Sequence, residues 1–225
     1  MVNYQIVIPA RGGSKRFPGK NIVNFNGKPL IAHSIEYAIS NGFNGKIWVN
    51  TDSSLIANIS IEHGAQVTLR TKELAGDYIP TVDVLKYQLL FFKHNKIPCD
   101  AIILLQATNP IRPDGCLRDG IKLYEQYNRS SLATFTKLNK KFGLKNNNVF
   151  FPQNYKTGDR LQDIKSSYYE NGLLYITSTN AIIKGDIVTK DVYPFIIDSI
   201  ESIIDIDEPN DLILAQFVFN QLEKK

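Results

Sequence analysis

The chain contains few of the residues that build disulfide frameworks and metal centres. Its 225 residues include two cysteines, three histidines, one tryptophan and one methionine. Cys99 and Cys116 lack metal-ligand spacing and a partnering histidine cluster. So low a cysteine count favours reduced, mostly buried thiols in a cytoplasmic protein over a disulfide between them. We therefore expect the fold to depend on its hydrophobic core rather than on cross-links.

Long apolar runs and a strong excess of one charge are also missing. No apolar stretch approaches the roughly 20 residues of a membrane span. The N-terminus has no basic segment before its short apolar run, so we do not expect a signal peptide. The net charge of +4 comes without a basic tail, which argues against a nucleic-acid partner. A modest positive balance instead suits an anionic small molecule, provided that the charge gathers at one site.

The sequence alternates short β-branched runs with helical stretches. This alternation predicts βαβ units in one α/β domain, with a mostly parallel sheet in a three-layer arrangement. Ligands of such sheets bind at the carboxyl ends of the strands. The residues that follow three of the strands, 9–20, 51–52 and 106–109, should therefore share one crevice. The strands are expected at residues 2–8, 46–50, 66–69, 101–105, 173–177 and 203–206, and the helices at 30–41, 53–63, 81–94, 114–127, 180–184 and 208–222.

A polar stretch at residues 137–165 interrupts this alternation. It contains several asparagines and lysines with scattered aromatic residues, and it has no sustained helical period. A long polar excursion inside a compact domain is usually functional or an interaction arm. We therefore expect a single domain over residues 1–225 with an arm inserted at 137–165.

The stretch IPARGGSKRFPGKNI, residues 8–22, concentrates four cations directly after the first expected strand: Arg11, Lys15, Arg16 and Lys20. Glycines permit positive φ values, so that successive backbone N–H groups can line a concavity for an anion. Lysine and arginine side chains neutralise phosphate oxygens. The spacing excludes a Walker loop, and no dinucleotide-binding glycine fingerprint is present. The stretch therefore favours a phosphate-binding loop of another kind over a solvated turn.

A second constellation, Ile204-Asp205-Ile206-Asp207, lies near the C-terminus. In a strand, residues two apart face the same way, so both carboxylates would lie on one face while the isoleucines point into the core. Two carboxylates together with substrate phosphate oxygens form a usual Mg²⁺ site. Asp207 also precedes Glu208-Pro209 and an expected helix, where an N-cap aspartate is favoured. Metal binding and helix capping both remain open for Asp207.

Taken together, these blocks resemble the cytidylyltransferases that activate acidic nine-carbon sugars, namely the CMP-N-acetylneuraminate synthetases and their legionaminate and pseudaminate relatives. The resemblance runs nearly end to end and depends on the order and spacing of the blocks. Besides the loop with its Asn21, the matching blocks are GKPL at 27–30, TD at 51–52, LR and ELA within 69–75, LLQATNP at 104–110 with Arg112, RLQD at 160–163, YENG at 169–172 and SIIDID at 202–207.

The resemblance implies a nucleotide-diphospho-sugar transferase (GT-A-like) fold and a reaction that depends on CTP and Mg²⁺. An acidic nine-carbon sugar would attack the α-phosphate of CTP and release pyrophosphate. Arg11, Lys20 and Asp207 would be catalytic, and Asp205 and Asp207 would hold Mg²⁺. The nucleotide would contact Ala10, Arg11, Gly12, Gly13, Ser14, Lys15, Lys20, Asn21, Arg70 and Thr81, and the sugar would contact Gln106, Arg112, Lys141, Arg160, Gln162 and Tyr175.

The resemblance also implies a homodimer in which the arm reaches over the partner's active site. Lys141 and Arg160 would then meet the sugar carboxylate across the interface, although solvated loop cations explain these two residues equally well. Ala107 and Asn109 depart from the proline and serine of the family pattern, which bears on the identity of the sugar. No obvious general base emerges, because the three histidines lie on expected helices.

Two rival interpretations remain. A GT-A glycosyltransferase shares this sheet and uses a D-x-D metal motif, but that motif normally lies mid-chain, and such enzymes lack a basic glycine loop on the first strand. A nucleotide-sensing homologue without activity is the second rival. Retention of the phosphate-binding cations and of both aspartates argues against it.

Overall fold

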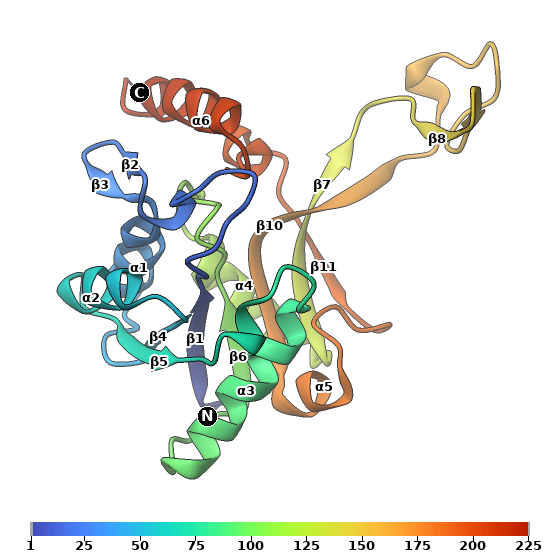
Figure 1. The fold of residues 1–225 in the computed structure, drawn as a ribbon. Helices are drawn as coiled ribbons and strands as arrows, with labels where there is room; N and C mark the ends of the chain where they lie inside the picture. The colour runs from blue at the N-terminus through green and yellow to red at the C-terminus, as the bar shows by residue number, and fades with distance from the viewer. Residues whose placement is uncertain (1, 225) are drawn as a thin grey trace.

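The computed structural model describes residues 2–224 and shows a seven-stranded sheet from which a two-stranded ribbon projects (Figure 1). The strand order is β11-β7-β10-β6-β1-β4-β5. β6, β1, β4 and β5 run parallel, as do β11 and β7, whereas β10 is antiparallel to both of its neighbours. The strands are β1 (Tyr4–Pro9), β4 (Ile47–Thr51), β5 (Gln66–Leu69), β6 (Ala101–Leu104), β7 (Ser131–Leu138), β10 (Ser167–Ser178) and β11 (Tyr193–Ile196).

The central strands β1, β4 and β6 are buried along almost their whole length because helices cover both faces of the sheet. Along β1, Ile6 and Ile8 enter one buried cluster with α1, α2 and α4, while Val7 enters another with α3 and α5. Strand side chains alternate between the faces, so three consecutive apolar residues fill two cores. The helices are α1 (Leu30–Ser40), α2 (Ser54–Glu62), α3 (Thr81–His94), α4 (Cys116–Tyr127), α5 (Thr179–Lys184) and α6 (Pro209–Leu222).

Local signals explain where several elements begin. The Ser53 hydroxyl accepts a hydrogen bond from the Ile56 N–H, so Ser53 is the N-cap of α2 among the three candidates that the sequence offered. α4 begins at Cys116, two residues later than expected, because Gly115 has φ of +77°.

Both cysteines are free thiols, and burial raises the pKa of Cys116 to about 11.

The C-terminal part differs from the prediction in three places. Residues 203–206 form no strand: a 3-10 turn, η4 (Ile200–Ile203), is followed by irregular chain. The predicted alternation of faces is nevertheless present, because Ile204 and Ile206 are buried in a third cluster with Phe25 and α6. Strands β7 and β11 were not expected. β7 is a continuous strand that leads from the core to the projecting ribbon. β11 carries Pro194 at the edge of the sheet, where a missing N–H is tolerated.

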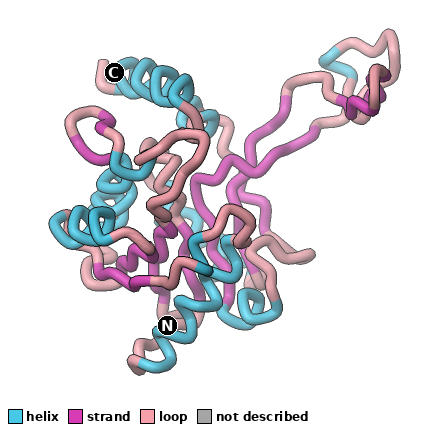
Figure 2. Tube along the Cα trace, viewed as in Figure 1, coloured by secondary structure: helices cyan, strands magenta, loops and turns pink. Residues whose placement is uncertain are grey.

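Beyond the core, β7 and β10 continue outward as a ribbon that ends in a small hairpin (Figures 1 and 2). The hairpin strands are β8 (Gly143–Asn146) and β9 (Val149–Pro152), and the 3-10 turn η3 (Leu161–Asp163) lies between β9 and β10. Apolar residues of the hairpin are exposed, including Leu144, Phe150 and Phe151. We call residues 139–166 the arm.

The remaining elements are short. β2 (Asn24–Phe25) and β3 (Lys28–Pro29) form a hairpin after the loop, and η1 (Lys20–Ile22) and η2 (Glu73–Ala75) are single 3-10 turns. Among residues 2–224, no helix combines the length and the apolar character that a membrane crossing requires.

Candidate active site

A cleft of about 320 Å³ opens at the carboxyl ends of β1, β5 and β6. It is lined by the loop after β1, by the segment between β5 and α3, and by residues 106–108 after β6. Two of the three predicted segments therefore border this crevice directly, and the third supports it through Asp52. The predicted site residues in its lining are Arg11, Ser14, Lys15, Lys20, Asn21, Arg70, Thr81, Gln106 and Asp207.

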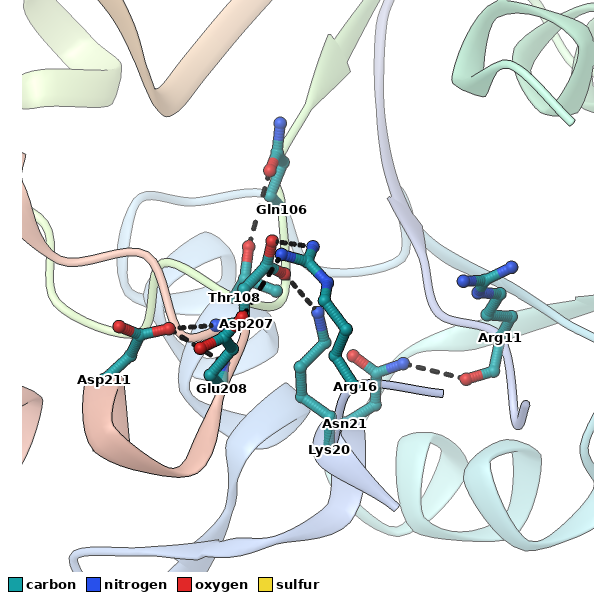
Figure 3. A network of polar contacts seen from close by, with 9 residues as sticks. All are labelled: Arg11, Arg16, Lys20, Asn21, Gln106, Thr108, Asp207, Glu208 and Asp211. Atoms are coloured by element: carbon teal, nitrogen blue, oxygen red, sulfur yellow. Dashed lines mark hydrogen bonds and ion pairs between the residues drawn. The ribbon is translucent and has the colours of Figure 1, made fainter. Parts of the chain in front are cut away.

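The loop after β1 is fixed by contacts with neighbouring strand ends. The Ala10 N–H donates to the Asn50 carbonyl, and the Gly12 N–H donates to Asp52 Oδ1 at 2.9 Å. A Cβ on Gly12 would lie only 3.1 Å from the Ser53 Cβ, so a glycine allows this close approach. Buried Asn21 donates to the Arg11 carbonyl at 2.9 Å and thereby joins the two ends of the loop (Figure 3). Ala10, Gly12 and Gly13 lie outside the cleft lining and shape the backbone instead.

On one side of the cleft, Asp77 neutralises two loop cations. Arg11 Nη1 lies 2.8 Å from Asp77 Oδ1, and Lys15 Nζ lies 2.5 Å from Oδ2. The Lys15 hydrogen bond lowers the pKa of Asp77. The pairing of Asp77 with the loop was not predicted from the sequence, because no spacing rule links residue 77 to the loop.

On the other side, Asp207 neutralises the other two cations. Lys20 Nζ lies 2.5 Å from Asp207 Oδ1, and the Arg16 guanidinium pairs with Oδ2 (Figure 3). Burial alone would raise the pKa of Asp207, but the hydrogen bond and charge of Lys20, followed by those of Arg16, lower it. All four cations therefore carry a carboxylate partner. Anionic phosphate oxygens could take the place of these carboxylates.

The capping alternative for Asp207 is answered by the start of α6. Glu208 is the N-cap residue, and it forms a capping box with Asp211. The Asp207 N–H donates to Asp211 Oδ2 at 2.9 Å, while the Asp207 carboxylate points at the loop cations (Figure 3). The capping function therefore belongs to Glu208, and the Asp207 side chain is available for ligands.

Asp205 and Asp207 satisfy the donor chemistry of a divalent cation. They sit close enough that the charge of Asp207 raises the pKa of Asp205, after the larger effect of burial and against a lowering contribution from the Thr108 hydroxyl. Asp207 lines the cleft and Asp205 lies outside its lining. Two hard oxygen donors of this kind suit Mg²⁺, which keeps several waters and few protein ligands. Within residues 2–224 there is no cluster of three or more acidic, histidine or cysteine side chains around them. Substrate phosphates would therefore have to complete such a site.

Arg70, directly after β5, and Thr81, the first residue of α3, both line the cleft. Arg70 is buried, and its Nε has no hydrogen-bond partner among residues 2–224. Burial lowers its pKa, the Asp52 charge opposes this effect, and the Arg11 charge adds to it. A buried, unpaired N–H beside a cleft is ready for an acceptor on a ligand. Thr81 opens α3, so the positive end of that helix dipole also faces the cleft.

Arg112 lies beneath the cleft rather than in it, contrary to its predicted contact with the sugar. Its three guanidinium nitrogens donate to the Leu173 carbonyl, the Ser34 hydroxyl and the Gln106 carbonyl at 2.8 to 3.0 Å. The guanidinium also lies 5.4 Å from the centre of the Tyr37 ring. With its donors used internally, Arg112 holds the backbone of Gln106, whose side chain does line the cleft.

The other predicted sugar residues lie away from the cleft of their own chain. Tyr175 is buried on β10, where its hydroxyl donates to Glu170 at 3.2 Å, and burial raises its pKa. Lys141 and Arg160 are exposed on the arm; Lys141 donates to the Asp159 carbonyl, and Arg160 pairs with Asp163 at 2.6 Å. Gln162 lines a second cleft at the base of the arm.

Comparison with known proteins agrees with this geometry. The family profile described as cytidylyltransferase matches residues 5–224. A pseudaminic acid cytidylyltransferase of Campylobacter jejuni is 30% identical over 221 residues, covering 95% of this chain and 94% of that protein. A CMP-N,N'-diacetyllegionaminic acid synthase of Legionella pneumophila is 32% identical over 216 residues, with 93% of each chain covered.

Solved structures confirm the expected fold. The structure of a CMP:2-keto-3-deoxy-manno-octonic acid synthetase complexed with CTP superposes with a TM-score of 0.71 and 17% identity, covering 97% of this chain and 98% of that one. A 4-diphosphocytidyl-2C-methyl-D-erythritol synthase gives 0.69 with 9% identity, covering 97% and 99%. At such identities these two structures support the nucleotidyltransferase fold alone. Because the family profile matches nearly the whole length of the chain, the chain belongs to the cytidylyltransferase family.

Proposed function

We propose that this protein transfers CMP from CTP to the anomeric hydroxyl of an acidic nine-carbon sugar and releases pyrophosphate. The observation that carries the proposal is the convergence of Arg11, Lys15, Arg16 and Lys20 with Asp207 in one cleft at the strand ends. Two relatives, a pseudaminic acid cytidylyltransferase and a CMP-N,N'-diacetyllegionaminic acid synthase, support this class of sugar by their names.

In the reaction, the sugar hydroxyl oxygen would form a bond to the α-phosphorus of CTP, and the bond from that phosphorus to the bridging oxygen of the β-phosphate would break. Negative charge then develops on the leaving pyrophosphate. Arg11, Lys15 and Lys20 would exchange their carboxylate partners for phosphate oxygens and stabilise that charge. Arg70 and Asn21, which also line the cleft, would help to hold the nucleotide.

Asp205 and Asp207 would hold Mg²⁺ together with phosphate oxygens of the nucleotide. When bound, the ion supplies a Lewis acid that polarises phosphoryl oxygens. Lys20 pairs with Oδ1 and Arg16 with Oδ2 of Asp207, so Asp207 would share its carboxylate between these cations and the ion. Within residues 2–224, none of the three histidines lines the cleft.

The sugar would lie beside Gln106, and the arm of a second copy would cover it. Exposed apolar residues on the arm, Phe150 and Phe151 among them, support a homodimer through this element. Lys137, Lys140 and Lys165 line the second cleft, at the base of the arm, together with Gln162. The sugar carboxylate would thus meet positive charge from Lys141 and Arg160 of the partner subunit. The free cysteine thiols fit a cytoplasmic reaction.

The proposal is tested by measuring pyrophosphate release against a panel of sugars. With CTP and Mg²⁺, release is expected only when a nonulosonic acid such as N-acetylneuraminate, legionaminate or pseudaminate is supplied. ATP in place of CTP should give little release. Equal release with ATP, or none with any of these sugars, would overturn the proposal.

A further inference from the structure

Asn109 is a fully buried polar residue at the centre of three segments that meet beneath the cleft. It follows the Gln106–Thr108 turn at the end of β6, and its side chain points away from the cleft, whose lining it does not join. Its amide nitrogen donates to the Ile204 carbonyl at 2.6 Å and to the Asn171 carbonyl at 3.2 Å. A single side chain therefore ties the turn to two segments that are 62 and 95 residues away.

The first of these contacts bears directly on Asp205. The residues on either side of Asp205 are both held by the turn, because the Ile204 carbonyl accepts from Asn109 and the Ile206 N–H donates to the Thr108 carbonyl at 2.8 Å. No strand pairing fixes this segment, since residues 204–207 lie outside the sheet. These two hydrogen bonds hold the backbone of Asp205 together with the burial of Ile204 and Ile206, and the Thr108 hydroxyl bonds to the Asp205 carboxylate itself.

The second contact anchors Asn109 to a rigid feature. Asn171 lies where β10 shifts register, and its own side chain donates to the Thr136 hydroxyl at 2.9 Å and accepts from the Leu173 N–H at 3.1 Å. The neighbouring Gly172 has φ of +78°, and a Cβ there would lie 2.9 Å from Asn109 Oδ1. The backbone of β10 thus leaves room for Asn109 Oδ1, which is buried without a hydrogen-bond partner among residues 2–224, while the amide nitrogen donates to the Asn171 carbonyl.

We propose that Asn109 is a positioning residue that orients Asp205 for the divalent cation. The inference rests on the proposed role of Asp205 and Asp207 as metal ligands. Groups that orient metal ligands typically change metal affinity by about 10–100-fold when they are removed. Asn109 touches neither the cleft nor the nucleotide, so its effect should appear in metal dependence and not in metal-free nucleotide binding.

The test compares Asn109→Ala and Asn109→Ser with Asp205→Asn and a matched control, Ser131→Ala. Ser131 is equally buried and takes part in two hydrogen bonds with Thr189, but it lies at the start of β7, at the other end of the sheet. For each protein, the Kd for CTP is measured in EDTA and in Mg²⁺, together with the Mg²⁺ concentration for half-maximal turnover, the Tm, and the hydrogen-exchange rate of the Ile206 amide.

We expect the wild type to bind CTP more tightly in Mg²⁺ than in EDTA and Asp205→Asn to lose most of that gain. Asn109→Ala should also lose it, with an unchanged Kd in EDTA, and its half-saturating Mg²⁺ should rise about tenfold. Asn109→Ser, which keeps one donor, should be intermediate and covers the case in which the alanine variant does not fold. The Ile206 amide should exchange faster in both Asn109 variants.

Two results would contradict these expectations in different ways. A wild type and an Asp205→Asn variant that both ignore Mg²⁺ would overturn the metal site of the proposed function. A Mg²⁺-responsive wild type with Asn109 variants that match it within twofold, or that only match Ser131→Ala in every measurement, would overturn the positioning role of Asn109 alone.

Discussion

The cleft and the arm are built in opposite ways. Around the cleft, apolar residues are buried between helices, and every loop cation has a carboxylate partner within its own chain. On the arm, Leu144, Phe150 and Phe151 are about half exposed, and the ribbon stands clear of the body (Figure 1). The cleft is therefore a site that a small anionic ligand completes. The arm is a surface that only another macromolecule can cover.

This contrast separates two kinds of function in one chain. Nucleotide binding should depend on the body, because nearly all of the groups that line the cleft belong to residues 9–21, 70–84 and 104–108, with Asp207 from the C-terminal part. Sugar recognition and assembly should depend on the arm, which carries Lys141, Arg160 and Gln162. Substitutions in the two regions should accordingly fail in different assays.

The largest effect is expected at Asp207. Asp207→Asn removes the carboxylate that faces Lys20, Arg16 and the proposed metal, so kcat should fall by about 100-fold or more. The fold should persist, because Glu208 and Asp211 cap α6 without it. Steady-state kinetics and thermal unfolding measure both quantities. Asp83→Asn, an exposed carboxylate on α3, is the control and should keep full activity; near-wild-type turnover of Asp207→Asn at saturating Mg²⁺ would remove Asp207 from the mechanism.

The next effect concerns the arm. Replacing Phe150 and Phe151 by serine should convert a dimer into monomers, as seen by sedimentation, since this removes the exposed apolar surface of the hairpin. The monomers would lose the contacts of the partner's Lys141 and the partner's Arg160 with the sugar carboxylate, so kcat/KM should fall by about tenfold or more while CTP binding is retained.

Phe217→Ser provides the matched control for the arm. Phe217 on α6 is 59% exposed, compared with 53% for Phe150, but it lies on the body. The control should remain dimeric. A wild type that sediments as a monomer, or a Phe217 variant that dissociates while the arm variant does not, would remove the arm from the interface.

The smallest effect is expected at Asp77. Because Asp77 competes with phosphate for Arg11 and Lys15, Asp77→Asn should bind CTP about threefold more tightly. Isothermal titration calorimetry in EDTA measures this change, with Glu73→Gln on the same segment as the control. Weaker binding by Asp77→Asn would instead mean that Asp77 orients Arg11 for the ligand.

Local sequence patterns predicted most of the body because each pattern has a local cause. The apolar runs of β1, β4 and β6 follow from burial on both faces, and capping residues mark the starts of α2 and α6 in the chain. The loop after β1 was predicted to bind phosphate from its composition alone, and its cations do gather at one cleft.

The errors arise where distant segments decide the structure. Ile204 and Ile206 alternate as in a strand, yet no neighbouring strand pairs with them, and the turn after β6 holds them instead. Arg112 was expected to contact the sugar because its block, residues 104–112, resembles the family pattern. The structure satisfies it with three carbonyl and hydroxyl oxygens below the cleft. Asp77 could not be predicted as a partner of the loop, because only the folded chain brings it there. Asn109 was expected in the crevice with residues 106–108, but it lies outside the cleft lining and donates to the Ile204 carbonyl.

The most direct test of the proposed reaction follows the phosphorus atoms of CTP. The protein is incubated with Mg²⁺, a nonulosonic acid and CTP that carries ³²P at either the α or the γ position, and the products are separated. If the proposed reaction takes place, the α label appears in a CMP-sugar and the γ label appears in pyrophosphate, in equal amounts. An α label that remains in CMP or CDP without a sugar adduct would contradict it.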